Sequence, residues 1–348
     1  MRHPNSDATP EVLDVSTDRR GVLGAGLALA AGTLLGTARD GRAADAPASP
    51  PAMPAAADAT PVDLKLLPGF KVERVKTSGA ELHTVVGGSG PPLLLIHGAP
   101  LTHLSWFRVA PELAKKYTVI AADLRGYGDS SKPADGDKHI NYSKRAMATD
   151  QVELMKHFGF SRFAVVGHDR GGRVAHRLAL DHPEAVSRMS VLDIVPTQYL
   201  YAHVTRAFVD AYFHWFLYLR PAPYPEDILN REVQSGAFSR GGLPELRDEY
   251  ARVYRNPAAI HGMCEDYRAS AGIDIEYDEA DIKAGKKVTC PLHVLWASDG
   301  AMGRMYDVLG IWKDHGTQVT GAPLTGGHNL QEANPAGVLA QLQPFLAG

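Results

Sequence analysis

The chain has 348 residues, a net charge of -3 and an apolar share of 45%. This length accommodates one large domain with an insertion, and the apolar content permits a sizeable core. The near-neutral charge excludes the basic surface that nucleic-acid binding requires, so we expect no nucleic-acid partner. The two cysteines, Cys264 and Cys290, do not form a disulfide framework, and no HExxH, CxxC or EF-hand pattern is present. We therefore expect no bridge, no metal and no cofactor.

The first sixty residues have the composition of a targeting segment. Arg19 and Arg20 precede an uncharged run over residues 21–37 that is rich in Ala, Gly and Leu. Paired arginines before a short apolar run predict a twin-arginine export signal over residues 1–43 and a periplasmic or secreted protein. Membrane contact is then needed for export only, although an uncleaved anchor is the alternative. The Ala/Pro-rich residues 44–61 predict a disordered spacer, and the folded part should begin near Val62.

The remaining chain alternates short apolar runs with longer amphipathic patterns, which is typical of a mostly parallel sheet flanked by helices. We expect helices over 142–158 and from Pro335 onward. The expected strands cover residues 70–76, 81–86, 92–96, 118–122, 163–166, 189–192, 291–296 and 318–321.

The strand pattern disappears in the middle of the chain. Residues 196–272 are rich in aromatic residues and arginine and have helical spacing. We interpret them as a helical cap inserted between two parts of one α/β core, residues 62–195 and 273–348. The sequence leaves open whether two copies associate as a homodimer.

The segment Gly167–Gly172, with the sequence GHDRGG, follows an expected strand and opens an expected helix. This is the context of a nucleophile elbow, whose glycines permit a sharp turn. Its central residue is Asp169 rather than serine. A carboxylate is already ionised and is suited to attack an sp³ carbon that bears a leaving group, forming an ester. The alternative for Asp169 is a helix cap.

Hydrolysis of such an ester needs a general base and an acid to orient it. His328, in a glycine-flanked loop after the last expected strand, is the candidate base. Two acids that follow strands, Asp193 and Asp299, compete for the orienting role. The backbone N–H groups of Arg170 and Ala99 are the candidate oxyanion donors.

Two arginines occupy the first turn of the elbow helix, where positive charge opposes the helix dipole. Arg170 and Arg173 are three residues apart and so share one face. Arginine binds carboxylates in a bidentate fork, so the pair indicates a site for a small carboxylic acid beside Asp169. A surface ion pair for Arg173, or a counter-charge to Asp169, is the alternative.

The motif GHDRGGR at residues 167–173 resembles the fluoroacetate (haloacetate) dehalogenase family of the α/β-hydrolase superfamily, and the resemblance extends over residues 68–348. It implies an α/β-hydrolase fold with a helical cap. It also implies that Asp169 is the nucleophile and His328 the base, that Arg170 and Arg173 hold the substrate carboxylate, and that the LDIVPT acid, Asp193, completes the triad.

The same resemblance implies a halide-binding group on the cap, formed by His214, Trp215 and Tyr267. Their N–H and O–H groups would stabilise a departing halide, which is a poor leaving group when it is fluoride. The implied reaction converts fluoroacetate or a related small 2-haloacid into the 2-hydroxy acid and halide.

Three alternatives remain. An epoxide hydrolase uses the same Asp-His-Asp triad with cap tyrosines, but an epoxide has no carboxylate to engage the two arginines. A haloalkane dehalogenase normally has tryptophan after the nucleophile, where this chain has Arg170. A non-catalytic sensor of small acids would not need a complete triad, although fold alone never excludes one.

Overall fold

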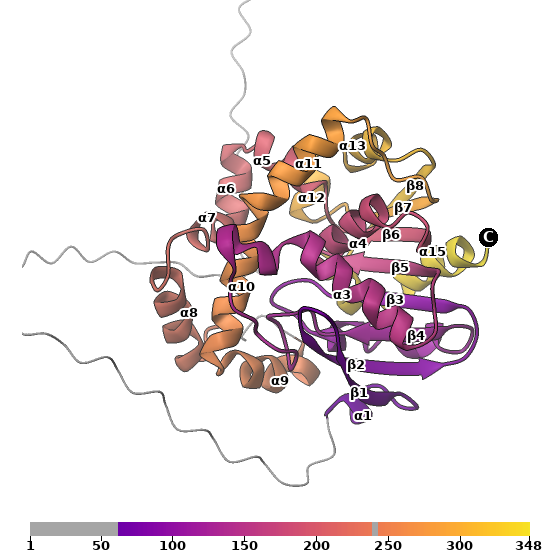
Figure 1. Ribbon diagram of the computed structural model, residues 1–348, viewed down its shortest axis with the longest axis horizontal. Coiled ribbons are helices and arrows are strands. Elements are labelled where there is room, and N and C mark those ends of the chain that lie inside the picture. Colours follow the sequence, from indigo (N-terminus) through magenta and orange to yellow (C-terminus); the bar gives the residue numbers. More distant parts are fainter. Residues whose placement is uncertain (1–61, 239–242) are drawn as a thin grey trace, which may run out of the picture.

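The computed structural model describes residues 62–238 and 243–348. The expected export signal and spacer lie outside the described residues. Eight strands form one sheet in the order β1-β2-β4-β3-β5-β6-β7-β8 (Figure 1). The pairs β1–β2 and β2–β4 are antiparallel, and all the others are parallel. The strands are β1 (Lys71–Lys76), β2 (Glu81–Gly88), β3 (Pro92–Ile96), β4 (Thr118–Ala122), β5 (Phe163–His168), β6 (Val186–Leu192), β7 (Leu292–Ala297) and β8 (Val319–Leu324).

The core strands are covered on both faces, and their side chains alternate between two apolar cores. Leu94 and Ile96 of β3 join one core, while Leu93 and Leu95 join the other. Burial on both faces explains why β3 reads as a continuous apolar run. The helices of the core are α1 (Val62–Leu66), η1 (His103–Trp106), α2 (Ala110–Leu113), η2 (Asp137–Tyr142), α3 (Lys144–His157), α4 (Arg170–Asp181), α12 (Ala301–Met305), α13 (Val308–His315), α14 (Leu330–Ala333) and α15 (Pro335–Ala347).

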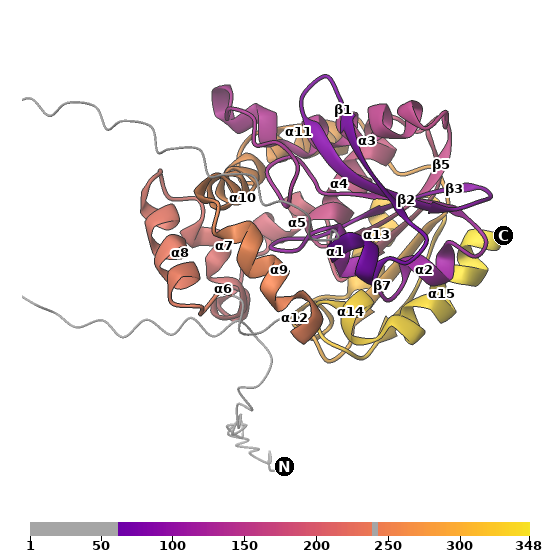
Figure 2. The ribbon, with the colours of Figure 1, turned by 90° about the horizontal axis from the view of Figure 1, so that it is seen from below.

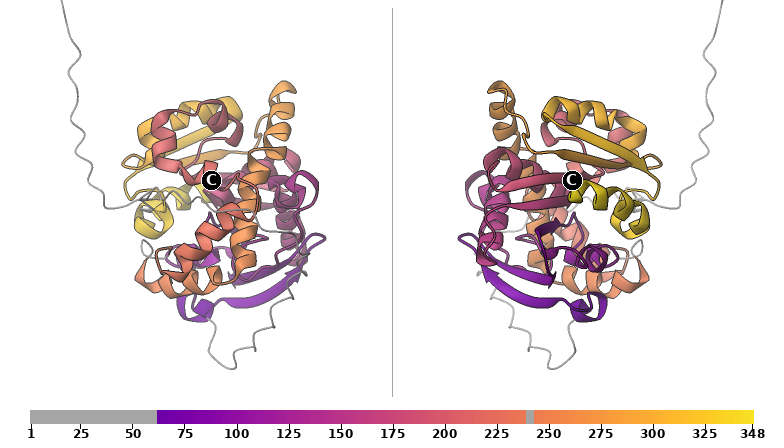
Figure 3. Two further views of the ribbon diagram at one scale, coloured as in Figure 1. Left: turned by 90° about the vertical axis from the view of Figure 1, so that its left-hand side faces the viewer. Right: turned by 90° about the vertical axis from the view of Figure 1, so that its right-hand side faces the viewer.

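The segment between β6 and β7 contains helices and no strand within the residues described there. These helices gather beyond one end of the strands (Figures 1 and 2), and they face the viewer in the left panel of Figure 3. They are α5 (Thr197–Ala202), α6 (Arg206–Tyr212), α7 (His214–Leu217), α8 (Tyr224–Gln234), α9 (Pro244–Tyr254), α10 (Pro257–Ser270) and α11 (Ile273–Lys283). The fold is thus the expected α/β-hydrolase architecture with an inserted helical cap.

Most expected element boundaries differ from the structure by one to three residues, and two differences concern the end of the cap and the edge of the sheet. The helical run continues beyond residue 272, because α11 packs against α5 and strand pairing resumes only at Leu292. The last strand, expected over 318–321, extends to Leu324. The strand includes Pro323, which is tolerated because β8 lies at the edge of the sheet, where a residue without an N–H group costs no ladder bond on the outer side.

Two further findings concern the described part of the chain. Cys264 and Cys290 are free thiols. Within residues 62–238 and 243–348, no helix is long and apolar enough to cross a membrane.

Candidate active site

The turn between β5 and α4 holds Asp169 in a strained conformation, with φ 46° and ψ -116°. A non-glycine residue rarely adopts positive φ, so the surroundings must impose it. The start of α4 packs closely against the end of β3 at Gly171. A Cβ at this position would lie 2.4 Å from the carbonyl oxygens of Ile96 and His97. The turn therefore presents the Asp169 side chain at the carboxyl end of the central strands, where such sheets bind ligands.

His328 lies between two carboxylates. Its Nδ1 is 2.6 Å from Asp193 Oδ2, and its Nε2 is 3.5 Å from Asp169 Oδ2. The other Asp193 oxygen accepts the backbone N–H of Ala297 at 2.9 Å, which fixes the carboxylate. The structure thus brings Asp169, His328 and Asp193 together in the arrangement of a nucleophile, a base and an orienting acid.

Electrostatics keep the nucleophile and the base in opposite charge states. Burial opposes ionisation of Asp169, but its hydrogen bond and charge interaction with His328 prevail and hold its pKa well below the usual range. Burial also opposes the charged form of His328, yet the hydrogen bonds to Asp169 and Asp193 raise its pKa to about 10. Near neutral pH the resting site therefore contains a carboxylate nucleophile beside an imidazolium.

The loop after β3 completes the surroundings of the nucleophile. The Ala99 N–H donates to Asp169 Oδ1 at 3.2 Å, so it lies where an oxyanion donor is needed. The Arg170 N–H belongs to the first turn of α4, whose N–H groups have no partner within the helix. His97 braces the loop, since its Nδ1 is 2.8 Å from Gly98 O and its Nε2 accepts the Leu124 N–H at 2.9 Å.

Arg170 has a partner that the sequence did not predict. Its Nε and Nη2 donate to the two carboxylate oxygens of Asp266, at 3.0 and 2.7 Å, and Nη2 also bonds Ser270. Its remaining nitrogen, Nη1, is buried and has no hydrogen-bond partner in the described chain. Asp266 therefore fixes the guanidinium and leaves one nitrogen free for a ligand.

Arg173 is also buried but has no carboxylate within ion-pair distance among the described residues. Its Nη1 donates to Val195 O and Thr197 Oγ1, each at 3.0 Å. Its Nε is buried without a partner in the same part of the chain. Burial first, and then the charge of Arg170, lower the pKa of Arg173. Two buried guanidinium groups with unsatisfied nitrogens create a strong demand for an anion.

A small hollow opens beside these groups. Its empty volume, which includes the mouth, is about 180 Å³. This is less than the several hundred Å³ typical of a pocket for a drug-sized ligand. The lining residues are Asp169, Arg173, Asp193, Leu200, Phe208, Tyr212, Trp215, Met302 and His328.

The residues expected to bind halide lie together above the two arginines. The Tyr267 ring is 5.5 Å from Trp215 and 5.9 Å from His214, measured between centroids. The Arg170 guanidinium lies 4.2 Å from the Tyr267 ring centroid, and that of Arg173 lies 4.8 Å from Trp215. Burial lowers the pKa of His214 to about 4, so its ring is neutral and carries one N–H at neutral pH.

Comparison with known proteins defines the family. A family model described as alpha/beta hydrolase fold matches residues 91–335. The chain is 45% identical to a fluoroacetate dehalogenase from Burkholderia sp over 289 residues, which cover 80% of this chain and 94% of that protein. This chain belongs to the fluoroacetate (haloacetate) dehalogenase family of the α/β-hydrolase superfamily.

Other relatives of this dehalogenase-family chain show the breadth of the superfamily. It is 31% identical to a soluble epoxide hydrolase from Corynebacterium sp. over 296 residues, or 78% of this chain and 95% of that protein. The solved structure of ALR0039 from Nostoc sp PCC 7120 superposes with a TM-score of 0.77 at 46% identity, covering 80% of this chain and 98% of that one. The chain is therefore a hydrolase.

Asp299, the rival candidate for the triad acid, has a different position in this dehalogenase-family site. Its carboxylate accepts the backbone N–H groups of Gly326 and Gly327 at 3.0 to 3.1 Å. These glycines precede His328 and have φ of 137° and 67°, so the carboxylate shapes the loop that carries the base. The structure pairs His328 with Asp193 and assigns loop support to Asp299.

Sequence reasoning missed Asp266. It stands 96 residues after Arg170 and directly before Tyr267, so nothing local links it to the elbow. The sequence could still have indicated such a partner. An arginine buried without a counter-charge is destabilising, so a carboxylate was to be expected near Arg170. Lys144 also bonds Asp266, so one carboxylate serves two buried cations.

Proposed function

We propose that this protein is a haloacetate dehalogenase, which hydrolyses the carbon–halogen bond of fluoroacetate or a related small 2-haloacid through an ester on Asp169. The observation that carries the proposal is the pair of unsatisfied guanidinium nitrogens, Arg170 Nη1 and Arg173 Nε, buried beside an ionised carboxylate nucleophile. The name of the Burkholderia relative supports the same substrate class.

In the first step the substrate carboxylate pairs with Arg170 and Arg173, which directs its α-carbon toward Asp169. An Asp169 oxygen attacks this carbon, and the halide leaves with the bonding electron pair. The side chains of His214, Trp215 and Tyr267 have no hydrogen-bond partner in the described chain, so their N–H and O–H groups remain available to the halide.

In the second step water hydrolyses the ester at the side-chain carbonyl carbon of Asp169. His328 accepts the proton of the water, while Asp193 stabilises the resulting imidazolium. The N–H groups of Ala99 and Arg170 stabilise the oxyanion that develops. The products are the 2-hydroxy acid and the free Asp169 carboxylate, with release of one proton.

Epoxide hydrolysis is the second candidate, because a relative named as an epoxide hydrolase aligns over most of the chain and Tyr212 lines the pocket. An epoxide has no carboxylate, so it would leave Arg170 Nη1 and Arg173 Nε unsatisfied in a buried site. Arg173 therefore favours the haloacid.

The test is a measurement of halide and diol production with fluoroacetate, chloroacetate and a neutral epoxide. We expect halide release from the acids, and its loss in Asp169→Asn. In His328→Gln we expect one equivalent of halide and an ester trapped on Asp169, visible by mass spectrometry. Turnover of the epoxide but not of the acids would refute the substrate assignment, and absence of any adduct on Asp169 would refute the mechanism.

A further inference from the structure

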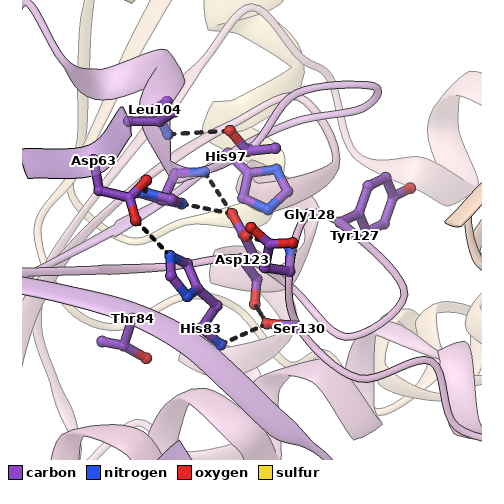
Figure 4. Close-up of polar contacts among 12 residues, drawn as sticks. Asp63, His83, Thr84, His97, Leu104, Asp123, Tyr127, Gly128 and Ser130 are labelled. Atoms are coloured by element: carbon purple, nitrogen blue, oxygen red, sulfur yellow. Dashed lines mark hydrogen bonds and ion pairs between the residues drawn. The ribbon is translucent and has the colours of Figure 1, made fainter. Parts of the chain in front are cut away.

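Figure 4 shows a buried polar cluster. Its members are not among the residues that line the active-site pocket. The cluster contains Asp63 from α1, His83 from β2 and His103 from η1, whose exposures are 5%, 5% and 3%. Asp63 Oδ2 is 2.9 Å from His83 Nε2, and Asp63 Oδ1 is 3.1 Å from His103 Nε2. Three separate segments of the chain thus bring one carboxylate and two imidazole side chains together.

Asp123 fixes the orientation of His103 from behind. Its Oδ1 lies 2.8 Å from His103 Nδ1 and also accepts the His103 backbone N–H at 2.9 Å. Its Oδ2 accepts the Asp129 N–H at 2.8 Å, so this carboxylate is held in place as an anion. His103 Nδ1 therefore faces the Asp123 carboxylate, and its Nε2 points at the Asp63 carboxylate. A proton or a metal ion can occupy the space between Nε2 and Asp63.

We propose that Asp63, His83 and His103 bind one divalent transition-metal ion of the zinc class. Imidazole nitrogens and a carboxylate are a ligand set that suits zinc, with bonds of about 2.0–2.2 Å. Asp63 lies 2.9 Å from His83 and 3.1 Å from His103, within the ~4.4 Å that two such bonds can span, and all the ligand atoms lie within 4.8 Å of one another. Asp123 supplies the carboxylate that a metal-bound histidine usually contacts through its other nitrogen.

A dication would balance the two buried carboxylate charges of this cluster. Asp63 and Asp123 contribute two negative charges to a buried site, and a dication with two neutral histidines cancels both. His83 Nδ1 is buried with no partner in the described chain.

The ion would attach the N-terminal helix to the core. Helix α1 has only five residues and cannot persist without tertiary contacts. Metal binding would join α1 to β2 and to η1, which follows the loop that carries Ala99. We infer a structural role, because none of the three ligands lines the pocket.

A second group provides an internal control. Asp135, His261 and Glu265 also lie within metal-binding reach of one another. There, Arg268 Nη1 lies 2.6 Å from Glu265 and 2.7 Å from the adjacent Glu226, so a resident cation already neutralises Glu265. We therefore expect no metal at this second group.

The experiment is a titration of the chelator-treated full chain with Co²⁺ and Zn²⁺, followed by equilibrium dialysis, the visible spectrum of Co²⁺ and the melting temperature. The expected result is one tightly bound equivalent, visible bands typical of nitrogen and oxygen ligation, and a melting temperature that rises with metal concentration. Asp63→Asn and His83→Gln should abolish the bound equivalent, whereas His261→Gln should retain it.

Absence of saturable binding by the unaltered chain would overturn the proposal and leave a proton between Asp63 and His103. Binding that survives in Asp63→Asn and His83→Gln, or that disappears in His261→Gln, would overturn it too. If the Asp63 and His83 variants fail to fold, the unaltered chain and His261→Gln still decide the outcome. The proposal then requires that both of these proteins bind Co²⁺ and give the same visible spectrum.

Discussion

At the scale of single residues, His328 has to change its protonation state during turnover. In the resting site the carboxylates of Asp169 and Asp193 raise its pKa to about 10, so at neutral pH it is an imidazolium and cannot accept a proton. Esterification of Asp169 removes one of these two negative charges. The same bond that captures the substrate therefore turns His328 into a base.

This coupling predicts the pH dependence of ester hydrolysis. The pKa of His328 should be lower in the ester than in the free enzyme, and hydrolysis needs the neutral form. The rate of ester breakdown should therefore rise with pH and reach its plateau well below pH 10. Single-turnover kinetics across pH would measure this, with titration of His328 in the free enzyme by NMR for comparison. A rate that keeps rising up to the pKa of the free enzyme would contradict it.

Asp266 gives a second prediction at this scale. Asp266→Asn removes the negative charge that pairs with the buried Arg170, and loss of one partner of a buried ion pair costs about 3–5 kcal/mol of unfolding free energy. The freed guanidinium should also lose its orientation, so we expect KM for haloacetate to rise more than kcat falls. Urea unfolding and steady-state halide release would measure the two effects.

Asp129→Asn is the matched control for Asp266→Asn. Its carboxylate pairs with Arg252 at the surface, where an ion pair contributes about 0–1 kcal/mol. Equal losses of unfolding free energy, or equal rises in KM, in the two variants would contradict the proposed role of Asp266 in orienting Arg170.

At the scale of elements, helix α4 begins with cations where most helices place acids. Arg170 and Arg173 lie in its first turn, and their positive charges are compensated in different ways. Asp266 of α10 pairs with Arg170, whereas the hydrogen-bond acceptors of Arg173 within residues 62–238 and 243–348 are the neutral oxygens of Val195 and Thr197. The cap therefore supplies one negative charge to the start of α4. On the proposed function, the substrate carboxylate supplies the other.

The packing of α4 on β3 leads to a prediction about Gly171. In Gly171→Ala the new Cβ would lie 2.4 Å from two backbone oxygens, so the elbow has to shift. We expect a loss of about 1–3 kcal/mol in unfolding free energy, as for other overpacked sites, together with a large fall in halide release. In the control Gly272→Ala the nearest atom is 3.5 Å away, so both quantities should change little. Full activity in Gly171→Ala would show that the elbow tolerates displacement.

At the scale of the whole molecule, we propose that residues 1–43 direct export of a folded enzyme. The double substitution Arg19→Lys and Arg20→Lys keeps the charge but removes the paired arginines on which twin-arginine recognition depends. The protein should then remain in the cytoplasm and retain halide-releasing activity in lysates. Cell fractionation followed by immunoblotting measures this, and unaltered export of the double variant would contradict the route.

The sequence alone determined the order of the strands along the chain and the position of the elbow. The strand residues 92–96 and 118–122 were predicted with their observed bounds, because continuous apolar runs reflect burial on both faces of a sheet. The motif at residues 167–173 identified Asp169, Arg170 and Arg173, because an elbow is a local turn whose glycines are visible in the sequence.

Only the tertiary structure decided which distant groups meet. It paired His328 with Asp193 and gave Asp299 to the backbone of Gly326 and Gly327. It also placed Asp266 against Arg170, across 96 residues of chain. The physical reason is that a buried charge requires a partner in space, and folding can supply that partner from any part of the chain.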